Sequence, residues 1–300
     1  MCIRDRVTPP RNGALAVAPP SLPGPAVVFG RQAGDVAVGI SAAARGGRLG
    51  VQTTAIGPDG APIPGADVAV SADGGPFADA VPCVGDGTYC ASTPVERDTP
   101  SVRVRLGLPD GSEPTVGFAL PSSPEHARAK RLVARAATET RTLKSVVIDE
   151  HLAASTDLAL DTVFEIRAPD RMRYRSTQVE DGRRTPAGDA IVIGGTRWDR
   201  PRPNVPWTRS AQQPLDQPVA DWRDAFDPSI LGSTRIRGRD ALRVSFRDAS
   251  VPAWLEVAID RRTGLPLRVR MTAAAHFMTR DWRAFDRPVA ISPPATGATR

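Results

Sequence analysis

The stretch that decides the fold is WLEVAIDRRTGLPLRVRMTAAAHFMTRDWRAF, residues 254–285. Apolar residues alternate with polar ones from Ala253 to Ile259, and the alternation resumes from Leu265 to Phe277 after the turn-forming segment Asp260–Gly264. A period of two places every second side chain on the same face of an extended chain. The stretch therefore predicts two or three long antiparallel strands of a curved sheet. The odd-numbered positions 255–259 and 265–277 are expected to form its apolar face.

The composition favours a mainly β chain of two domains. The 300 residues are 41% hydrophobic, which is enough to bury a core in each domain. The 30 prolines and 26 glycines form no regular repeat, so many short strands joined by turns are favoured over long helices. The net charge of +6 is not gathered into a basic cluster of five residues. We therefore expect a solvated basic surface and no nucleic-acid partner.

The beginning of the sequence is interpreted separately from the fold. Met1–Arg6 lacks the apolar region of a signal peptide and resembles translated adaptor sequence. We interpret residues 1–25 as an artefactual start and a linker, and we expect part of the natural chain to be missing upstream. The sequence contains no run of about 18 apolar residues, so it predicts no transmembrane helix of its own.

Residues 26–120 predict an immunoglobulin-like β-sandwich. Roughly seven short alternating segments lie in this range, and turns rich in Gly, Pro and Asp separate them. Cys83 and Cys90 flank one of these turns, and a hairpin there would place their sulfur atoms opposite each other. We favour a disulfide over a metal pair, because CxxC spacing is absent and no histidine is near in the sequence. A disulfide would indicate an extracytoplasmic location.

Residues 121–292 predict a helix followed by a long antiparallel sheet, with residues 293–300 as a tail. The helix is expected between Pro121 and Leu143, with Ser123 as its cap and Pro124 at its first position. Residues 201–228 interrupt the strand pattern, and we expect a long loop with a short helix around 221–226. Long loops over a sheet are often lids. One stripe of the main helix is apolar and should face the sheet: Ala129, Leu132, Val133, Ala136, Thr140 and Leu143.

An apolar pocket between this helix and the sheet is the principal candidate site. All five tryptophans lie in residues 121–292, and they suit either the lining of an acyl or small-molecule cavity or the filling of a core. The candidates for the pocket lining are Leu132, Val133, Ala136, Trp198, Trp254, Phe277 and Trp282.

His276 and Met278 are the candidates for a metal site. They lie two residues apart on one predicted strand, so their side chains point to the same face. Imidazole and thioether groups together suit copper. In a regular strand Met271 would lie on the opposite face and would join the pair only through a bulge. The alternative is that His276 and Met278 line a cavity or pack against the helix, because methionine is an adaptable packing residue.

Catalytic motifs are absent from the sequence. It contains three histidines and no GxSxG, HExxH, P-loop or dinucleotide fingerprint, so nucleophilic, zinc and nucleotide chemistry lack their usual local devices. We therefore expect a protein that is not an enzyme.

Three segments of the second domain carry a resemblance to a known family. RAPDRMRYR at 167–175, AIVIGGTRWDR at 190–200 and WLEVAIDRRTGLPLRVRM at 254–271 resemble the LolA/LppX lipoprotein-carrier family over residues 122–292. The resemblance implies a curved half-barrel covered by helices, with an apolar cavity that receives acyl chains.

The first domain carries a second resemblance. VVFGRQAGDVAVGI, VQTTAIGPDGAPIPGADVAV and VPCVGDGTYCAS, within residues 26–120, resemble the YtkA- or FixH-like sandwich of fused CopC/CopD copper-resistance proteins. In such fusions a carrier-like domain follows and ends in a motif close to RMTAAAHFM, residues 270–278. The resemblance implies an extracytoplasmic module tethered to a membrane-embedded region of the same protein. The CopC histidine motif and the CopD transmembrane helices are absent from this chain.

The leading expectation is thus a non-catalytic, ligand-binding accessory module of a copper-associated membrane protein, with a lipid or another apolar ligand as its partner. Two alternatives remain: a copper-binding module that uses His276 and Met278, and a structural spacer at the membrane surface.

Overall fold

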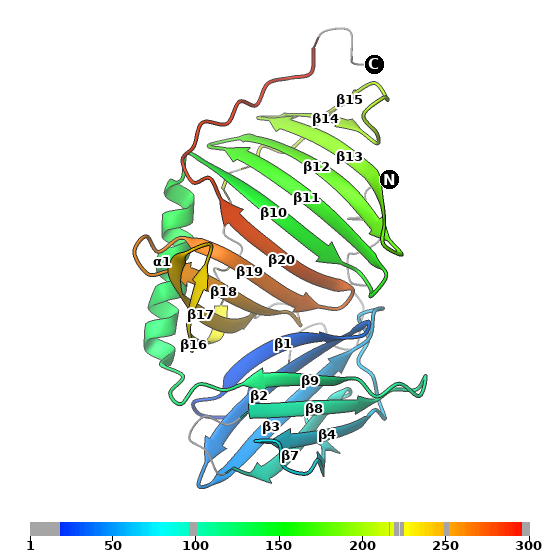
Figure 1. Cartoon of the computed structure of the whole chain (residues 1–300), viewed down its shortest axis with the longest axis vertical. Coiled ribbons are helices and arrows are strands. Elements are labelled where there is room, and N and C mark those ends of the chain that lie inside the picture. The colour runs from blue at the N-terminus through cyan, green and yellow to red at the C-terminus, as the bar shows by residue number, and fades with distance from the viewer. Residues whose placement is uncertain are drawn as a thin grey trace.

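The computed structural model of the chain describes residues 19–95, 101–215, 217–218, 222, 225–248 and 252–295. Within these residues the chain forms three antiparallel sheets and one helix (Figure 1). The mainly β fold class predicted from the sequence is confirmed. Residues 1–18 of the predicted start and linker and residues 296–300 of the predicted tail lie outside the described residues.

Two of the sheets form a sandwich in the N-terminal part of the chain. One has the order β1-β2-β3-β7-β6 and the other β5-β4-β8-β9. Their facing side chains, among them Phe29, Leu49 and Leu106, form one buried core, as the alternation predicted. The strands are β1 Val27–Ala33, β2 Val36–Arg45, β3 Arg48–Ile56, β4 Asp67–Ala72, β5 Ala78–Asp79, β6 Val81–Pro82, β7 Thr88–Pro94, β8 Ser101–Gly107 and β9 Thr115–Ala119.

The predicted disulfide joins Cys83 and Cys90, whose Cα atoms are 5.8 Å apart. Cys83 follows β6 directly, and Cys90 lies in β7 opposite Val81. The backbone N–H of Cys83 also donates to the carbonyl of Thr88. The disulfide therefore closes the short hairpin that the spacing of the two cysteines indicated.

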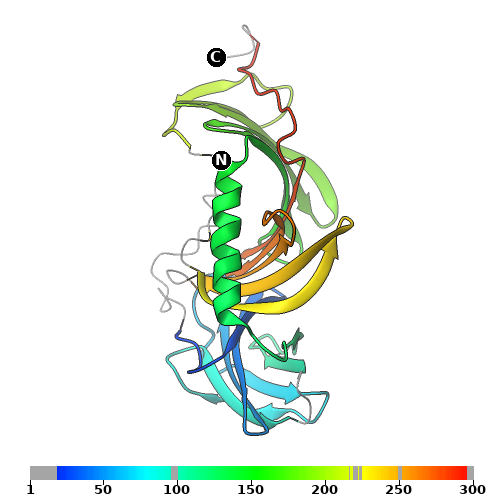
Figure 2. The same ribbon diagram turned by 90° about the vertical axis from the view of Figure 1, so that its left-hand side faces the viewer.

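The third sheet is long and curved, and we call it the large sheet. Its eleven strands have the order β15-β14-β13-β12-β11-β10-β20-β19-β18-β17-β16. Figure 2 shows the helix α1, His126–Thr142, running along one face of this sheet. The strands are β10 Ser145–Ala153, β11 Leu158–Arg167, β12 Arg171–Glu180, β13 Arg183–Ile193, β14 Thr196–Arg200, β15 Thr208–Ala211, β16 Ala225–Ile236, β17 Arg239–Asp248, β18 Trp254–Asp260, β19 Pro266–Ala273 and β20 His276–Arg283.

The start of α1 differs from the prediction. The residue before the helix is Glu125, which has a left-handed backbone with φ 45° and makes no capping hydrogen bond through its side chain. The prediction that Ser123 caps the helix is wrong, because the chain turns at Glu125 and the helix begins two residues after Pro124.

The segment 201–228 also differs in part. It contains the short strand β15, and its last residues, from Ala225 on, belong to β16. Much of the short helix predicted around 221–226 lies outside the described residues, and the described residues Ala225 and Phe226 are in a strand rather than a helix.

A tight turn between β19 and β20 overturns the predicted continuous apolar face. Ala274 and Ala275 form the turn, and Ala275 has a φ of 47°. Met271 is therefore the cross-strand partner of Met278, and paired residues share a face. Odd-numbered positions of β19 and even-numbered positions of β20 lie together, so the prediction that Phe277 shares the face of Met271 is wrong.

The sandwich and the large sheet meet through two pairs of residues. Gly30 and Gly39 are partners in the β1–β2 ladder, and Trp254 and Thr272 are partners in the β18–β19 ladder. A Cβ atom built on Gly39 would lie 1.8 Å from Cζ2 of Trp254, and one built on Gly30 would lie 2.7 Å from Cβ of Thr272. The glycines thus let the indole of Trp254 lie directly on the sandwich.

Candidate ligand-binding site

The candidate site is the face of the large sheet that α1 covers, which we call the inner face. The inner-face residues come from alternate positions of the strands, as the strand period requires. They form one buried apolar cluster with the helix, and Phe246, Val244 and Val257 are at most 1% exposed. Further members are Ile148, Ile166, Met172, Val192, Ile230, Leu242, Leu255, Ile259, Val269, Met278 and Trp282.

The helix contributes small side chains to this cluster. Its buried residues are Ala129, Val133, Ala136, Ala137 and Thr140. Because most of these side chains are short, the helix axis can approach the sheet closely. Leu132 packs against the same cluster and is only partly buried.

Trp222 covers the cluster from the segment that precedes β16. Its side chain is 5% exposed, and its ring meets the ring of Trp282 edge to face, with centroids 6.3 Å apart. Such an edge-to-face pair is a favoured aromatic arrangement. The segment predicted as a lid therefore does place one large aromatic side chain over the inner face.

Three buried polar atoms near α1 lack a hydrogen-bond partner among the described residues. They are Nε1 of Trp282, Oγ1 of Thr140 and Nε2 of His126. The other ring nitrogen of His126, Nδ1, lies 2.8 Å from the carbonyl oxygen of Pro228. An unsatisfied buried polar group costs about 1–3 kcal/mol, and native proteins usually satisfy it with water or a ligand.

One ion pair interrupts the apolar inner face. Glu150 and Arg280 are cross-strand partners on β10 and β20, and Nε of Arg280 lies 2.5 Å from Oε2 of Glu150. Strand alternation places Glu150 on the face that carries Ile148 and Leu152. The pair is largely buried, since the side chain of Glu150 is 7% exposed. The inner face thus combines a wide apolar surface with one charged pair.

Four of the seven predicted lining residues come together at the inner face. Val133, Ala136 and Trp282 are buried in the cluster, and Leu132 lies at its border. The sequence indicated these residues through the helical stripe and through the aromatic content of the last strand.

The other three predicted lining residues lie elsewhere. Trp254 and Phe277 pack in a separate cluster with Val28 and Ala37 of the sandwich. They lie on the opposite face of the large sheet, which we call the outer face, because Trp254 alternates with Leu255 and the turn after Ala273 reverses the parity of β20. Trp198 packs near Ile191, Trp207 and Ile291, in a group of side chains that we call the edge cluster.

Sequence reasoning missed two large members of the inner face. Phe246 lies in a predicted strand, but its strong burial follows from strand pairing and not from any local signal. Trp222 lies in the predicted loop, and its pairing with Trp282 joins segments 60 residues apart in the sequence.

His276 and Met278 do share a face, and Met271 joins them. Met278 is 5% exposed and belongs to the inner-face cluster, whereas His276 is half-buried at the turn. Among the described residues no group of three or more His, Cys, Asp or Glu side chains could hold a metal ion. Met278 thus packs against the apolar cluster, as the alternative interpretation expected.

Comparison with known proteins gives similarity to solved structures only. No family model matches the chain, and no curated protein matches it. In the part of the chain that the structure describes, no helix is long and apolar enough to cross a membrane.

The solved structures that resemble the chain are carrier-type folds. LprF from Mycobacterium bovis is 14% identical, covers 57% of this chain and 99% of its own, and has a TM-score of 0.43. Lipoprotein LppX from Mycobacterium tuberculosis is 12% identical, covers 55% and 99%, and has a TM-score of 0.42. A LolA superfamily protein from Nitrosomonas europaea is 14% identical, covers 54% and 94%, and has a TM-score of 0.24. At these values the likeness does not extend to function.

Proposed function

We propose that α1 and the large sheet form a non-catalytic, carrier-type module that binds an apolar ligand such as an acyl chain at the inner face. The observation that carries this proposal is the buried apolar layer beneath α1 and Trp222, which contains the unsatisfied indole N–H of Trp282. Ligand sites are mostly apolar, with a few polar groups that orient the ligand. Trp282 would donate a hydrogen bond to the carbonyl group of an acyl ester or acid.

Ligand entry requires side chains of the layer to move. Trp222 is the best candidate for this movement, because its ring lies between the covering segment and Trp282. A tryptophan side chain accounts for about 150–250 Å² of buried surface, so its displacement would open a large apolar area. The small side chains of α1 would then border the space.

A fluorescent fatty acid tests this proposal. Parinaric acid is titrated into the wild type and into Trp282→Phe, which keeps an aromatic ring and removes the N–H donor. We expect saturable binding to the wild type and binding about tenfold weaker to the variant, since one hydrogen bond is lost.

The matched control is Trp207→Phe. Trp207 is 9% exposed and belongs to the edge cluster, so this variant should bind the fatty acid as the wild type does. Absence of saturable binding to the wild type contradicts the proposal, and so does equal weakening by the two replacements. A spacer would bind no probe at all.

A copper site is a second candidate, and the strand register favours it. Because Met271 pairs with Met278 and His276 lies two residues before Met278, all three side chains share one face. Thioether and imidazole ligands suit Cu(I). Calorimetric titration of Cu(I) and Cu(II) into the wild type and His276→Ala tests the site, and equal binding by the two proteins would remove it.

We also infer an extracytoplasmic location, in a copper-associated protein whose membrane-embedded region lies upstream in the same chain. The Cys83–Cys90 disulfide supports the location, because such bonds persist in oxidising compartments. The association with copper and with a membrane region depends on the sequence resemblance. Transmembrane helices in the complete upstream reading frame would support it, and a complete frame without them would contradict it.

A further inference from the structure

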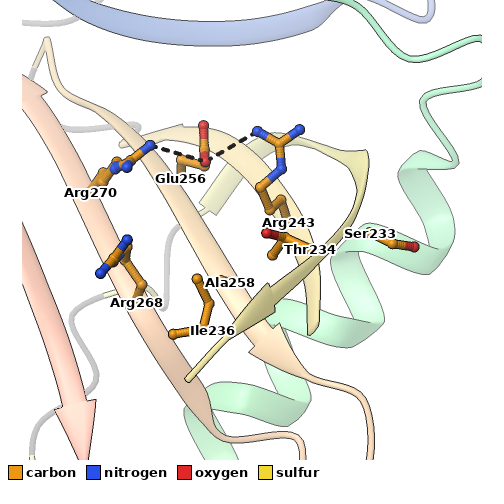
Figure 3. A pocket seen from close by; sticks show the side chains of 8 residues that line it. All are labelled: Ser233, Thr234, Ile236, Arg243, Glu256, Ala258, Arg268 and Arg270. Carbon is orange, nitrogen blue, oxygen red and sulfur yellow. Dashed lines mark ion pairs between the residues drawn. The ribbon is translucent and has the colours of Figure 1, made fainter. Parts of the chain in front are cut away.

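The outer face of the large sheet contains a depression of about 240 Å³ over β16–β19. Arg243, Glu256, Arg268 and Arg270 are its charged lining residues. Figure 3 shows Arg243 and Arg270 on either side of Glu256, each joined to it by an ion pair. The inner face and its apolar layer lie on the other side of the same strands.

The arginines outnumber the acid that holds them. Nη1 of Arg243 and Nη1 of Arg270 lie 3.6 and 3.9 Å from the same oxygen of Glu256. Arg31 of β1 reaches the other oxygen of Glu256 at 3.4 Å. These distances exceed the 2.7–2.9 Å or so of a charge-assisted hydrogen bond. Three guanidinium groups around one carboxylate leave a net charge of two positive units.

Two of the guanidinium groups retain free hydrogen-bonding capacity. Arg268 is occupied, because it donates to both oxygens of Asp281 at 2.6 and 2.8 Å. Arg31 donates to the carbonyl of Gly30 at 2.8 Å. By contrast, Arg243 and Arg270 make no hydrogen bond to any described residue, and their side chains are 33% and 49% exposed. Their N–H groups therefore face the solvent at the depression.

We propose that this depression binds a phosphate group through Arg243 and Arg270. A phosphate monoester dianion would neutralise the two excess charges, and the planar guanidinium fork matches phosphate oxygens. Glu256, whose side chain is 9% exposed, holds the two guanidinium groups close together although they repel each other. This arrangement lowers the entropy lost when the anion binds.

Calorimetric titration with inorganic phosphate at low ionic strength tests the site. We expect saturable binding to the wild type, binding about tenfold weaker to Arg270→Gln, and no detectable binding to the Arg243→Gln/Arg270→Gln double variant. The single variant guards against misfolding, because the Arg270 side chain is 49% exposed.

The matched control is Arg235→Gln. Arg235 is also on β16–β19, but its side chain is 69% exposed and it pairs with Asp240 at 3.0 Å, outside the depression. It should bind phosphate as the wild type does. The proposal is overturned if the wild type shows no saturable binding, or if Arg235→Gln and Arg270→Gln weaken binding equally.

The phosphate could belong to a lipid headgroup or to a soluble compound, and vesicle sedimentation distinguishes the two. Phosphatidylcholine vesicles with and without phosphatidate are compared. Retention that needs phosphatidate and is lost in Arg270→Gln indicates a headgroup site. Saturable phosphate binding without vesicle retention indicates a soluble phosphate compound. Both outcomes support the phosphate site, and neither depends on fatty-acid binding at the inner face.

Discussion

Gly39 is in contact with the indole of Trp254, and it allows the sandwich to pack against the large sheet. A Cβ atom at residue 39 would lie 1.8 Å from Cζ2 of Trp254, so a larger side chain must displace the indole or the whole sandwich. The register pairs Gly39 with Gly30, which leaves a flat strip of backbone beneath the tryptophan. The packing of the two parts therefore depends on the absence of two side chains.

Gly39→Ala should destabilise the chain by about 1–3 kcal/mol, the usual cost of overpacking a buried contact. Urea unfolding measures this change. Gly117→Ala is the control, because no atom lies within 4 Å of a Cβ built there and Gly117 is also in a sandwich strand. Equal effects of the two replacements would show that the cost reflects strand glycines in general.

Asp149 carries a pH-dependent part of the stability on the outer face. Arg283 donates to both oxygens of Asp149 at 2.6 and 2.8 Å. Hydrogen bonds and charge from Arg283 hold the pKa of Asp149 below its ordinary value of 3.8. The cross-strand partner of Asp149 is another acid, Asp281, and Arg237 lies between the two carboxylates at 3.6 and 3.5 Å. Arginines thus offset a like-charge pair.

Asp149→Asn should therefore destabilise the chain at about pH 7, and the deficit should shrink at about pH 2. A lowered native pKa stabilises the folded state above the unfolded pKa, and this contribution is lost as the pH falls through the native pKa. The deficit should not exceed about 1 kcal/mol, since the pair is partly exposed. Urea unfolding at the two pH values measures it, with Asp79→Asn in the sandwich as the control. A deficit that is independent of pH would contradict this account.

At the scale of elements, the hairpin between β6 and β7 depends on its disulfide. Val81–Pro82 is a strand of two residues, too short to hold its place by backbone hydrogen bonds alone. The Cys83–Cys90 bond spans a sequence separation of 7, and closure of so short a loop stabilises by about 2–3 kcal/mol.

Replacement of Cys83 and Cys90 by serine should lower the free energy of unfolding by about that amount. Cys2→Ser is the control, since the third cysteine lies outside the described residues. A double variant as stable as the wild type under oxidising conditions would show that the disulfide adds no stability.

The elements also show which features the sequence could predict. Alternation predicted the strands of the opening stretch, the helical stripe predicted which side of α1 is buried, and the spacing of Cys83 and Cys90 predicted their bond. The turn at Ala274–Ala275 contains no Gly, Pro, Asn or Asp, so no residue type marked it. Without that turn the parity of β20 was assigned wrongly, and Phe277 was placed on the inner face.

Contacts between distant segments were also beyond sequence reasoning. Trp254 was assigned to a pocket because it is large and aromatic, and only its contact with Gly39 of the sandwich shows what it packs against. Trp222 reaches Trp282 from a segment without a periodic pattern. Pairing between remote strands and loops decides such positions.

At the scale of the whole molecule, the two faces of the large sheet differ in chemistry. The inner face is apolar and covered by α1 and Trp222. The outer face packs on the sandwich through Trp254 and is rich in arginine beside that junction. We therefore expect an apolar ligand and a phosphate group to bind on opposite sides of the same strands.

The central claim is that an acyl chain binds beneath α1, and photolabelling tests it most directly. A fatty acid with a terminal diazirine is bound, irradiated and mapped by mass spectrometry, without any substitution in the chain. The account predicts adducts on α1, on β20 or at Trp222 that unlabelled fatty acid removes by competition. Competed adducts confined to the edge cluster around Trp198 or to the junction around Trp254, or the absence of any competed adduct, would contradict it.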